Sequence, residues 1–195
     1  KSLHRLKRKM RQSRSLNVFT VKSYSKAVIS RMHVGQKISF GMVNAVFGFT
    51  SILLKLLTEI KPDYLVAAFD LPQETFRKKQ YKEYKAQREA PDPEFISQIS
   101  LTEKILKGIN IPILGVPEYE ADDVIGSVAH HIHTKHKDIE VIIVSGDNDT
   151  LQLVNDRVSV FTMRKGIADT LIYDEAAVKE RYGLNPQQLV DMKAL

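Results

Sequence analysis

The stretch VIIVSGD, residues 141–147, is a run of apolar residues that ends in an acid. A short, continuous apolar run bounded by turn residues is typical of a strand buried on both faces of a parallel sheet. Three other segments have the same character: YLVAAFD at 64–70, IPIL at 111–114 and VSVFTM at 158–163. Together they predict the strands of a central, mostly parallel sheet.

Helical patterns alternate with these strands. Apolar residues recur at spacings of three and four in residues 43–60, which favours an amphipathic helix that ends at Lys61-Pro62. Asn185, Pro186 and Gln188 form a capping signal for a last helix. Further helices are predicted at 93–108, 120–133 and 174–182. Strands that alternate with helices indicate an α/β fold with helices flanking the sheet.

Composition limits the classes of protein. A chain of 195 residues with 43% apolar content suits one packed domain, expected at 16–195 after a basic, unstructured arm at 1–15. The absence of cysteine excludes disulfides, cysteine-based zinc sites and thiol catalysis. No apolar run reaches the roughly 18 residues that a membrane span needs, so no membrane partner is expected.

The charge is unevenly distributed. The first 58 residues carry 12 Lys or Arg and no acid, whereas the remainder carries 17 Lys or Arg against 23 acids. A basic arm beside an acidic body suits a polyanionic partner, because contacts with phosphate release counterions. An organelle transit peptide, a disordered tail and mistranslated sequence remain alternatives for the basic segment.

Six acids follow the predicted strands or open a predicted helix. They are Asp70, Glu120, Asp122, Asp123, Asp147 and Asp149. Ligands of open parallel sheets gather at the carboxyl ends of the strands, so we expect these carboxylates to meet there. Crowded carboxylates repel one another unless a cation lies among them. Without cysteine, their oxygens favour Mg²⁺ or Mn²⁺, and two such ions would support phosphodiester hydrolysis. Taken singly, each acid is equally typical of a helix cap or a turn.

A basic segment with aromatic residues follows Asp70. In ETFRKKQYKEYKAQR, residues 74–88, six Lys or Arg alternate with Phe and Tyr, which suits single-stranded nucleic acid. A solvated helix face with tyrosines anchored in the core is the alternative. The histidines at 130, 131, 133 and 136 are interpreted as a polar helix end, because no carboxylate completes a standard zinc spacing.

These segments resemble the 5′-nuclease family, which comprises the 5′–3′ exonuclease and flap endonuclease domain of bacterial DNA polymerase I and its free-standing relatives. The resemblance is carried in order by NAVFGF, VAAFD, TFRKKQYKEYKAQR, EYEADDVIGSVA, VSGDNDTLQLV and YGLNPQQLVDMKAL, which together span residues 44–195. It implies a PIN-like fold, two divalent metal ions, and cleavage of 5′ flaps or RNA primers.

The resemblance also assigns roles. It identifies the six acids as metal ligands. It implies that Arg77, Lys78, Tyr81, Lys85 and Arg88 belong to a helical arch that holds the 5′ strand and the scissile phosphate. Arg77, Lys78 and Lys85 are therefore the candidate catalytic residues, and Tyr84 joins the DNA-binding set from the pattern of its segment.

The chain departs from the family at two places. The family has an Asp-Gly after its first strand, but the corresponding position falls near Thr20-Val21, where no acid occurs. The family also continues beyond the final DMKAL into a segment with further acids and a helical DNA-binding motif. We therefore expect a truncated C-terminal part and an altered metal site.

The sequence predicts a Mg²⁺- or Mn²⁺-dependent 5′–3′ exonuclease and flap endonuclease. Its expected partners are DNA with a 5′ flap, a nick or an RNA primer, and a polymerase domain on the same natural chain. A catalytically weakened structure-specific DNA-binding domain and a PIN-like ribonuclease are the alternatives. The expected location is the cytoplasmic nucleoid for a bacterial protein, or an organelle if the basic start is a transit peptide.

Overall fold

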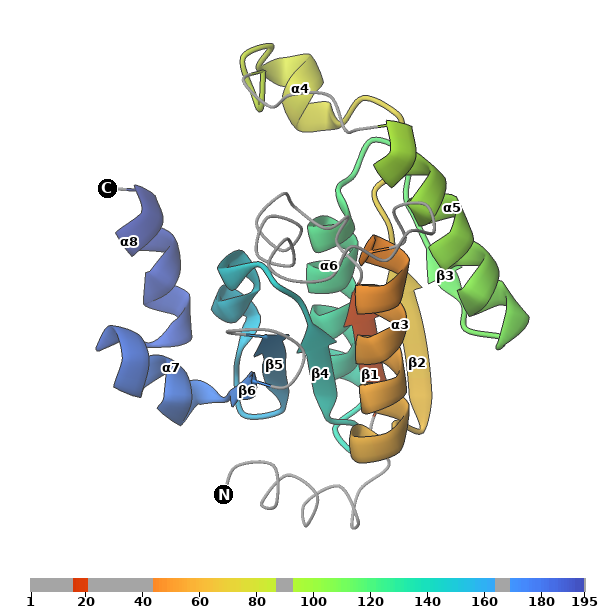
Figure 1. Cartoon of the computed structure of the whole chain (residues 1–195). Helices are drawn as coiled ribbons and strands as arrows, with labels where there is room; N and C mark the ends of the chain where they lie inside the picture. Colours follow the sequence, from red (N-terminus) through yellow and green to blue (C-terminus); the bar gives the residue numbers. More distant parts are fainter. Residues whose placement is uncertain (1–15, 21–43, 87–92, 164–168, 195) are drawn as a thin grey trace.

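One mixed sheet forms the centre of the molecule. The computed structural model describes residues 16–20, 44–86, 93–163 and 169–194. Within them, six strands lie in the order β3-β2-β1-β4-β5-β6 (Figure 1). The strands are β1 (Leu16–Thr20), β2 (Tyr64–Ala68), β3 (Ile113–Leu114), β4 (Val141–Val144), β5 (Val158–Met163) and β6 (Thr170–Tyr173). All neighbours pair in parallel except β5 and β6. The predicted mostly parallel sheet is thus confirmed.

The helices lie close to the positions that the sequence predicts. They are α3 (Asn44–Lys55), the π-helical turn η1 (Leu56–Ile60), α4 (Phe76–Gln80), α5 (Pro93–Gly108), α6 (Ala121–Lys135), the 3-10 turn η2 (Asn148–Leu153), α7 (Glu175–Tyr182), the 3-10 turn η3 (Pro186–Gln188) and α8 (Leu189–Ala194). Lys61 ends the first helical segment in a left-handed conformation, with its N–H donating to the Leu56 carbonyl. The capping signal at Asn185 is also confirmed, since the Asn185 N–H donates to Gln188 Oε1 at 2.9 Å.

Strand β4 shows why the sheet has two covered faces. Its four residues are all buried. Because side chains alternate along a strand, Val141 and Ile143 pack in one apolar cluster while Ile142 and Val144 pack in another. The first cluster includes the apolar face of α6, and the second includes that of α3 (Figure 1). This burial explains the continuous apolar run that begins at residue 141.

Two strands, β1 and β6, are not predicted from continuous apolar runs. Only the family resemblance predicts β1, which lies in the middle of the sheet between β2 and β4. Strand β6 was missed altogether. No helix in the described part of the chain is long and apolar enough to cross a membrane. The predicted basic arm at 1–15 lies outside the described residues.

Candidate active site

A cavity of about 530 Å³ lies where the sheet ends in acidic turns. Five of the six predicted metal ligands line it together with basic and aromatic side chains. The lining residues are Arg77, Tyr84, Lys85, Glu120, Asp122, Asp123, Gly126, Ser127, Asp147, Asp149, Thr150, Gln152 and Leu153. The structure thus brings the acids of two distant segments to one cavity.

The first group of acids belongs to the start of α6. Glu120 precedes the helix, and Asp122 and Asp123 lie in its first turn. The Glu120 N–H donates to Asp123 Oδ2 at 3.0 Å, which satisfies one amide that the helix leaves unpaired. The capping role and the placement in the cavity therefore coexist in the same carboxylate.

The second group of acids occupies the turn between β4 and η2. Asp147 Oδ1 accepts a hydrogen bond from the Asp149 N–H at 2.8 Å, and the Asp147 carbonyl accepts one from Thr150 Oγ1 at 2.7 Å. The Asp147 N–H donates to Ser145 Oγ at 3.0 Å. These bonds hold the turn in shape and present its acids to the cavity.

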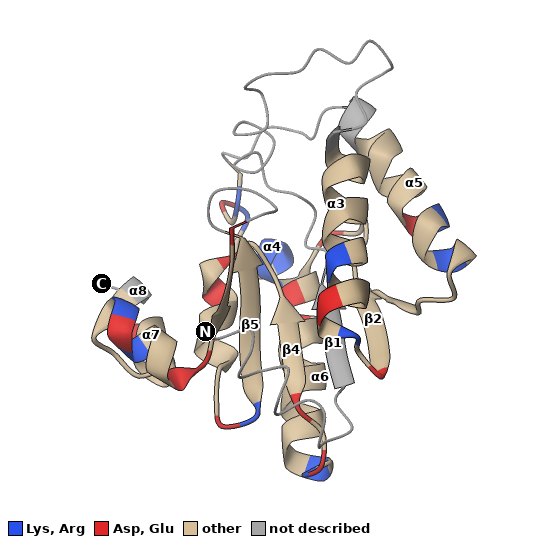
Figure 2. Ribbon diagram, turned by 60° about the horizontal axis from the view of Figure 1, so that its bottom comes forward, with Lys and Arg blue, Asp and Glu red and all other residues tan. Residues whose placement is uncertain are grey.

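Basic side chains of the segment after β2 contact the acids of α6. Arg77 in α4 makes a two-pronged ion pair with Asp123, with both N–O distances at 2.6 Å. Lys85 donates to Glu120 Oε1, and Tyr84 donates to the other carboxylate oxygen of Glu120 at 3.3 Å. In Figure 2 the ribbon of α4 is blue, which marks its Lys and Arg residues.

This pairing changes the protonation equilibria of both partners. The hydrogen bonds from Arg77 are the largest cause that lowers the pKa of Asp123 below its ordinary value, and burial opposes them. The same contact raises the pKa of Arg77. Asp123 is therefore a carboxylate and Arg77 a cation throughout the neutral pH range.

Asp70 lies apart from the cavity lining. It follows β2 by two residues, and its Oδ1 accepts a hydrogen bond from the Ala121 N–H at 2.6 Å. This contact fixes the end of β2 to the first turn of α6, where negative charge is favourable. Its predicted role as a metal ligand stays a prediction.

The side chains that line the cavity include the oxygen ligands that a hard cation prefers. Its lining carries five carboxylates against two basic side chains, and such an excess of negative charge favours divalent ions with oxygen ligands. Among the described residues, no three His, Asp or Glu side chains are already arranged as a metal site. The oxygens of Glu120 and Asp123 face Arg77 and Lys85 instead, so an ion there requires these side chains to rearrange.

The other residues of the basic segment occupy different surroundings. Lys78 lines a second cavity of about 270 Å³, which shares Tyr84, Lys85 and Glu120 with the first. Tyr81 is exposed and donates to Glu83 at 2.7 Å. Within residues 74–86, the described part of this segment, α4 is the only helix, whereas the family resemblance implies a helical arch. Arg88, predicted to contact DNA, lies outside the described residues.

Some residues of the cavity were not predicted. Gly126 and Ser127 lie in α6 four residues after Asp122 and Asp123. Residues four apart share a helix face, so the spacing alone offered a signal for them. Gln152 and Leu153 follow the acidic turn in η2 and had no such signal.

Strand β1 ends at the position where the family resemblance places an acid. Thr20 is its last residue and pairs with Ala68, two residues before Asp70. The preceding residue, Phe19, pairs with Val144, three residues before Asp147. The carboxyl end of β1 thus lies between the two acidic turns, and no carboxylate extends from it.

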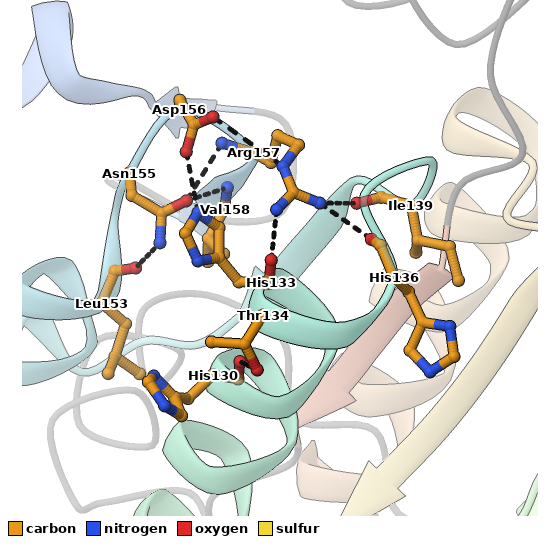
Figure 3. A network of polar contacts seen from close by, with 10 residues as sticks. All are labelled: His130, His133, Thr134, His136, Ile139, Leu153, Asn155, Asp156, Arg157 and Val158. Atoms are coloured by element: carbon orange, nitrogen blue, oxygen red, sulfur yellow. Dashed lines mark hydrogen bonds and ion pairs between the residues drawn. The ribbon is translucent and has the colours of Figure 1, made fainter.

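The histidine-rich end of α6 forms a separate polar network (Figure 3). Arg157 donates to the carbonyls of His133, His136 at 2.8 Å and Ile139 at 3.4 Å. His133 Nε2 lies 2.9 Å from Asp156 Oδ1. Arg157 therefore satisfies carbonyls that the end of a helix leaves without partners. The network agrees with the interpretation of these histidines as a polar helix end.

Comparison with known families agrees with the geometry of the site. Residues 19–183 match the model of the family described as the 5′-3′ exonuclease, N-terminal resolvase-like domain. The chain belongs to this family. The match includes all six predicted metal-binding acids and the basic segment.

The curated relatives that match the chain include bacterial DNA polymerases. DNA polymerase I of Mycobacterium tuberculosis is 42% identical over 152 residues, which cover 78% of this chain and 17% of the polymerase. DNA polymerase I of Bacillus subtilis is 42% identical over 153 residues, with the same shares of each chain. The protein from Chloroflexus aurantiacus is 44% identical over 154 residues, covering 77% of this chain and 16% of the polymerase. The chain thus spans about a sixth of these relatives.

Solved structures share the fold at low sequence identity. The bacteriophage T5 5′-exonuclease with bound zinc has a TM-score of 0.67 at 19% identity, covering 92% of this chain and 66% of that one. A T5 flap endonuclease variant in complex with DNA and metal ions has a TM-score of 0.65 at 18% identity, covering 91% and 65%. These similarities confirm the predicted PIN-like α/β fold.

Proposed function

We propose that this domain is a divalent-metal-dependent 5′–3′ exonuclease and flap endonuclease that hydrolyses phosphodiester bonds at DNA 5′ ends. One observation carries the proposal: carboxylates from the start of α6 and from the turn after β4 line a single cavity with Arg77, Tyr84 and Lys85. The family and the T5 complex with DNA and metal ions support it.

The acids are assigned to the ions. Glu120, Asp122, Asp123, Asp147 and Asp149 would hold two Mg²⁺ or Mn²⁺ ions, with Asp70 at the edge of the site. When bound, such ions activate the attacking water and stabilise the leaving oxygen of the phosphodiester. Carboxylate oxygens and retained waters are the ligands that these ions prefer.

The basic segment is assigned to the DNA strand. Arg77 and Lys85 reach the cavity from α4 and the turn after it, so their charges would hold the scissile phosphate beside the acids. Tyr84 lines both cavities and offers a ring on which an unpaired base can stack. Lys78, Tyr81 and Arg88 would extend the same contact along the 5′ strand.

The decisive experiment is a cleavage assay with a 5′-labelled flap substrate in Mg²⁺, in Mn²⁺ and in EDTA. We expect short 5′ products in either ion and none in EDTA. A substrate of single-stranded RNA tests the ribonuclease alternative, since an enzyme of that kind would cut the RNA in preference to the flap. Arg77→Ala should weaken binding of the flap and lower the salt dependence of that binding.

A second function is supported by the end of β1. Thr20 ends β1 between β2 and β4, whose following turns carry Asp70 and Asp147, and the family resemblance places an acid near this position. This favours a catalytically weakened domain that binds branched DNA. Flap binding that persists in EDTA, without cleavage in Mg²⁺ or Mn²⁺, would favour this second function over the first.

The relatives support a proposal for the cellular setting. The polymerases quoted above come from bacteria, which supports action on a bacterial chromosome and gives no support to an organellar location. Since those relatives are DNA polymerases I, we propose that a polymerase domain on the same natural chain fills the gap as 5′ nucleotides are removed.

A further inference from the structure

We propose that Arg77 and Lys85 are built-in counter-ions that compete with divalent ions for Asp123 and Glu120. Ion binding would then release both basic side chains to the DNA phosphates. The inference rests on the proposed function and specifies how that site is regulated. It predicts that ions and DNA strengthen each other's binding.

The geometry at Asp123 makes the competition direct. Arg77 Nη1 contacts Oδ2 and Nη2 contacts Oδ1, so the guanidinium covers both carboxylate oxygens at 2.6 Å. Oδ2 also accepts the Glu120 N–H at 3.0 Å. A carboxylate offers only about four lone-pair positions. Three of these positions are occupied, and the positive guanidinium repels a second cation, so an ion gains a favourable approach to Asp123 only when Arg77 withdraws.

Glu120 is engaged in the same way. Lys85 occupies Oε1, while Tyr84 donates to Oε2 at 3.3 Å and Arg77 lies 4.0 Å from that oxygen. The Glu120 side chain is only 14% exposed, so its charge is weakly screened by solvent. Charge must therefore be replaced if Lys85 leaves, and a divalent ion supplies it.

The segment that carries these bases has a separate attachment. The Phe76 N–H donates to the Glu118 carbonyl at 2.8 Å. The rings of Phe76 and Tyr119 lie 5.3 Å apart. These contacts hold the base of α4 without using the cavity acids. Arg77 and Lys85 can thus exchange partners while the segment stays in place.

The energetic consequence follows from linkage. A cation that is bound to a carboxylate is not available to a phosphate, so the state that binds ions is also the state that binds DNA. If ions raise DNA affinity by some factor, DNA must raise ion affinity by the same factor. Removing Arg77 removes the competitor at Asp123 and should strongly weaken this coupling.

The first measurement is Mn²⁺ binding to the whole chain without DNA, by calorimetry. We expect Arg77→Ala to bind Mn²⁺ about five-fold or more tightly than the unchanged protein, the lower end of ordinary coupling factors. The Mn²⁺ affinity of Arg77→Lys should lie between those of Arg77→Ala and the unchanged protein, because lysine keeps the charge but loses the two-pronged contact. Lys79→Ala is the matched control, since it removes a charge from the same helix but is paired with Glu118 outside the cavity.

The second measurement is affinity for 5′-flap DNA in Ca²⁺ and in EDTA, by fluorescence anisotropy. In the unchanged protein and in Lys79→Ala, Ca²⁺ should raise the affinity about five-fold or more. In Arg77→Ala this gain should largely disappear. Mn²⁺ affinity that is unchanged or weaker in Arg77→Ala, or equally raised in Lys79→Ala, would overturn the inference.

The inference and the proposed function fail in different ways. If the unchanged protein cleaves the flap but Arg77→Ala binds Mn²⁺ no more tightly, the nuclease assignment stands and the counter-ion exchange is rejected. Tighter Mn²⁺ binding in Arg77→Ala with no cleavage by any form would sustain the exchange and reject the nuclease.

Discussion

At the scale of single residues, Asp147 has two tasks that separate experimentally. Its side chain holds the turn after β4 through the Asp149 N–H, and it also faces the candidate ion site. We predict that Asp147→Ala lowers flap cleavage by roughly 100-fold or more while DNA affinity changes little, because the side chain would bind the ion and not the phosphate. Single-turnover cleavage and anisotropy measure the two effects.

The control for Asp147 is another acid of the same region of the chain. Asp138 is exposed in the turn before β4, at the opposite end of that strand, and lines neither cavity. Asp138→Ala should cleave like the unchanged protein. Equal turnover in both variants would remove Asp147 from the ion site.

Thr20 allows a test in which a carboxylate is added to the site. We predict that Thr20→Asp raises the cleavage rate at limiting Mg²⁺ by about tenfold, because it adds a carboxylate at the carboxyl end of β1, between the turns that carry Asp70 and Asp147. Thr20→Asn has nearly the same shape without the charge and should show no gain. A rate in Thr20→Asp no higher than in Thr20→Asn would mean that the site is complete without this acid.

At the scale of elements, the C-terminal end of α6 depends on Arg157. We predict that Arg157→Ala lowers the free energy of unfolding by about 1–3 kcal/mol, because the half-buried carbonyls of His133 and Ile139 lose a charged donor. Asp156→Ala should cost at most about 0.5 kcal/mol, since its side chain is 69% exposed and the pair with His133 is screened. Urea denaturation compares the two variants.

The pH dependence of the Asp156 effect has a definite sign. The hydrogen bond from His133 is the main cause that lowers the pKa of Asp156 in the folded protein. The stability that it contributes is therefore present above the ordinary Asp pKa of about 3.9 and is lost as the pH falls through the folded value. The difference in the free energy of unfolding between Asp156→Ala and the unchanged protein should become smaller at acid pH. A difference that grows there would contradict the assignment.

The end of α7 offers a matched pair of glycines. Gly183 ends the helix at φ +70, where an L side chain is strained, whereas Gly108 at the end of α5 has open space around it and no positive φ. We predict that Gly183→Ala lowers the free energy of unfolding by about 1 kcal/mol and that Gly108→Ala is neutral or stabilising by up to about 1 kcal/mol. Equal losses in both would show that the conformation at Gly183 is not the cause.

Prediction from sequence succeeded where an element was long or closed by clear caps. The helix at 93–108 and the capping signal at Asn185 both appear as expected. It failed for β6, whose four residues TLIY are too few to show a strand period, and for β1, whose LNVFT contains two polar residues in a basic stretch. Such strands are specified by pairing with distant neighbours.

The sequence predicts which acids belong to the candidate site, but not the contacts that these acids make with other side chains. The acids of α6 and of the turn after β4 meet as expected, because parallel strands bring their carboxyl ends to one edge. The pairing of Arg77 with Asp123 joins residues 46 positions apart, and no local spacing encodes it. The capping contact of Asp70 with Ala121 likewise arises only from the packing of β2 against α6.

At the scale of the whole molecule, ion binding should stabilise the fold. An ion present at 100 times its dissociation constant adds about 2.7 kcal/mol to the folded state, which for a domain of this size is a rise in Tm of roughly 5–10 °C. We predict such a rise for Mn²⁺ in differential scanning fluorimetry and none for the double variant Glu120→Gln/Asp123→Asn. The absence of any rise in the unchanged protein would argue against ions at this cavity.

The central place of β1 also has a consequence for biosynthesis. This strand leaves the ribosome before the other described strands. Its first neighbour in the sheet, β2, follows at residues 64–68, but its second neighbour, β4, is synthesised only at residues 141–144. One side of β1 therefore stays open to foreign strands until β4 has been synthesised. Slow elongation between β2 and β4 should make the nascent domain prone to aggregate and dependent on chaperones.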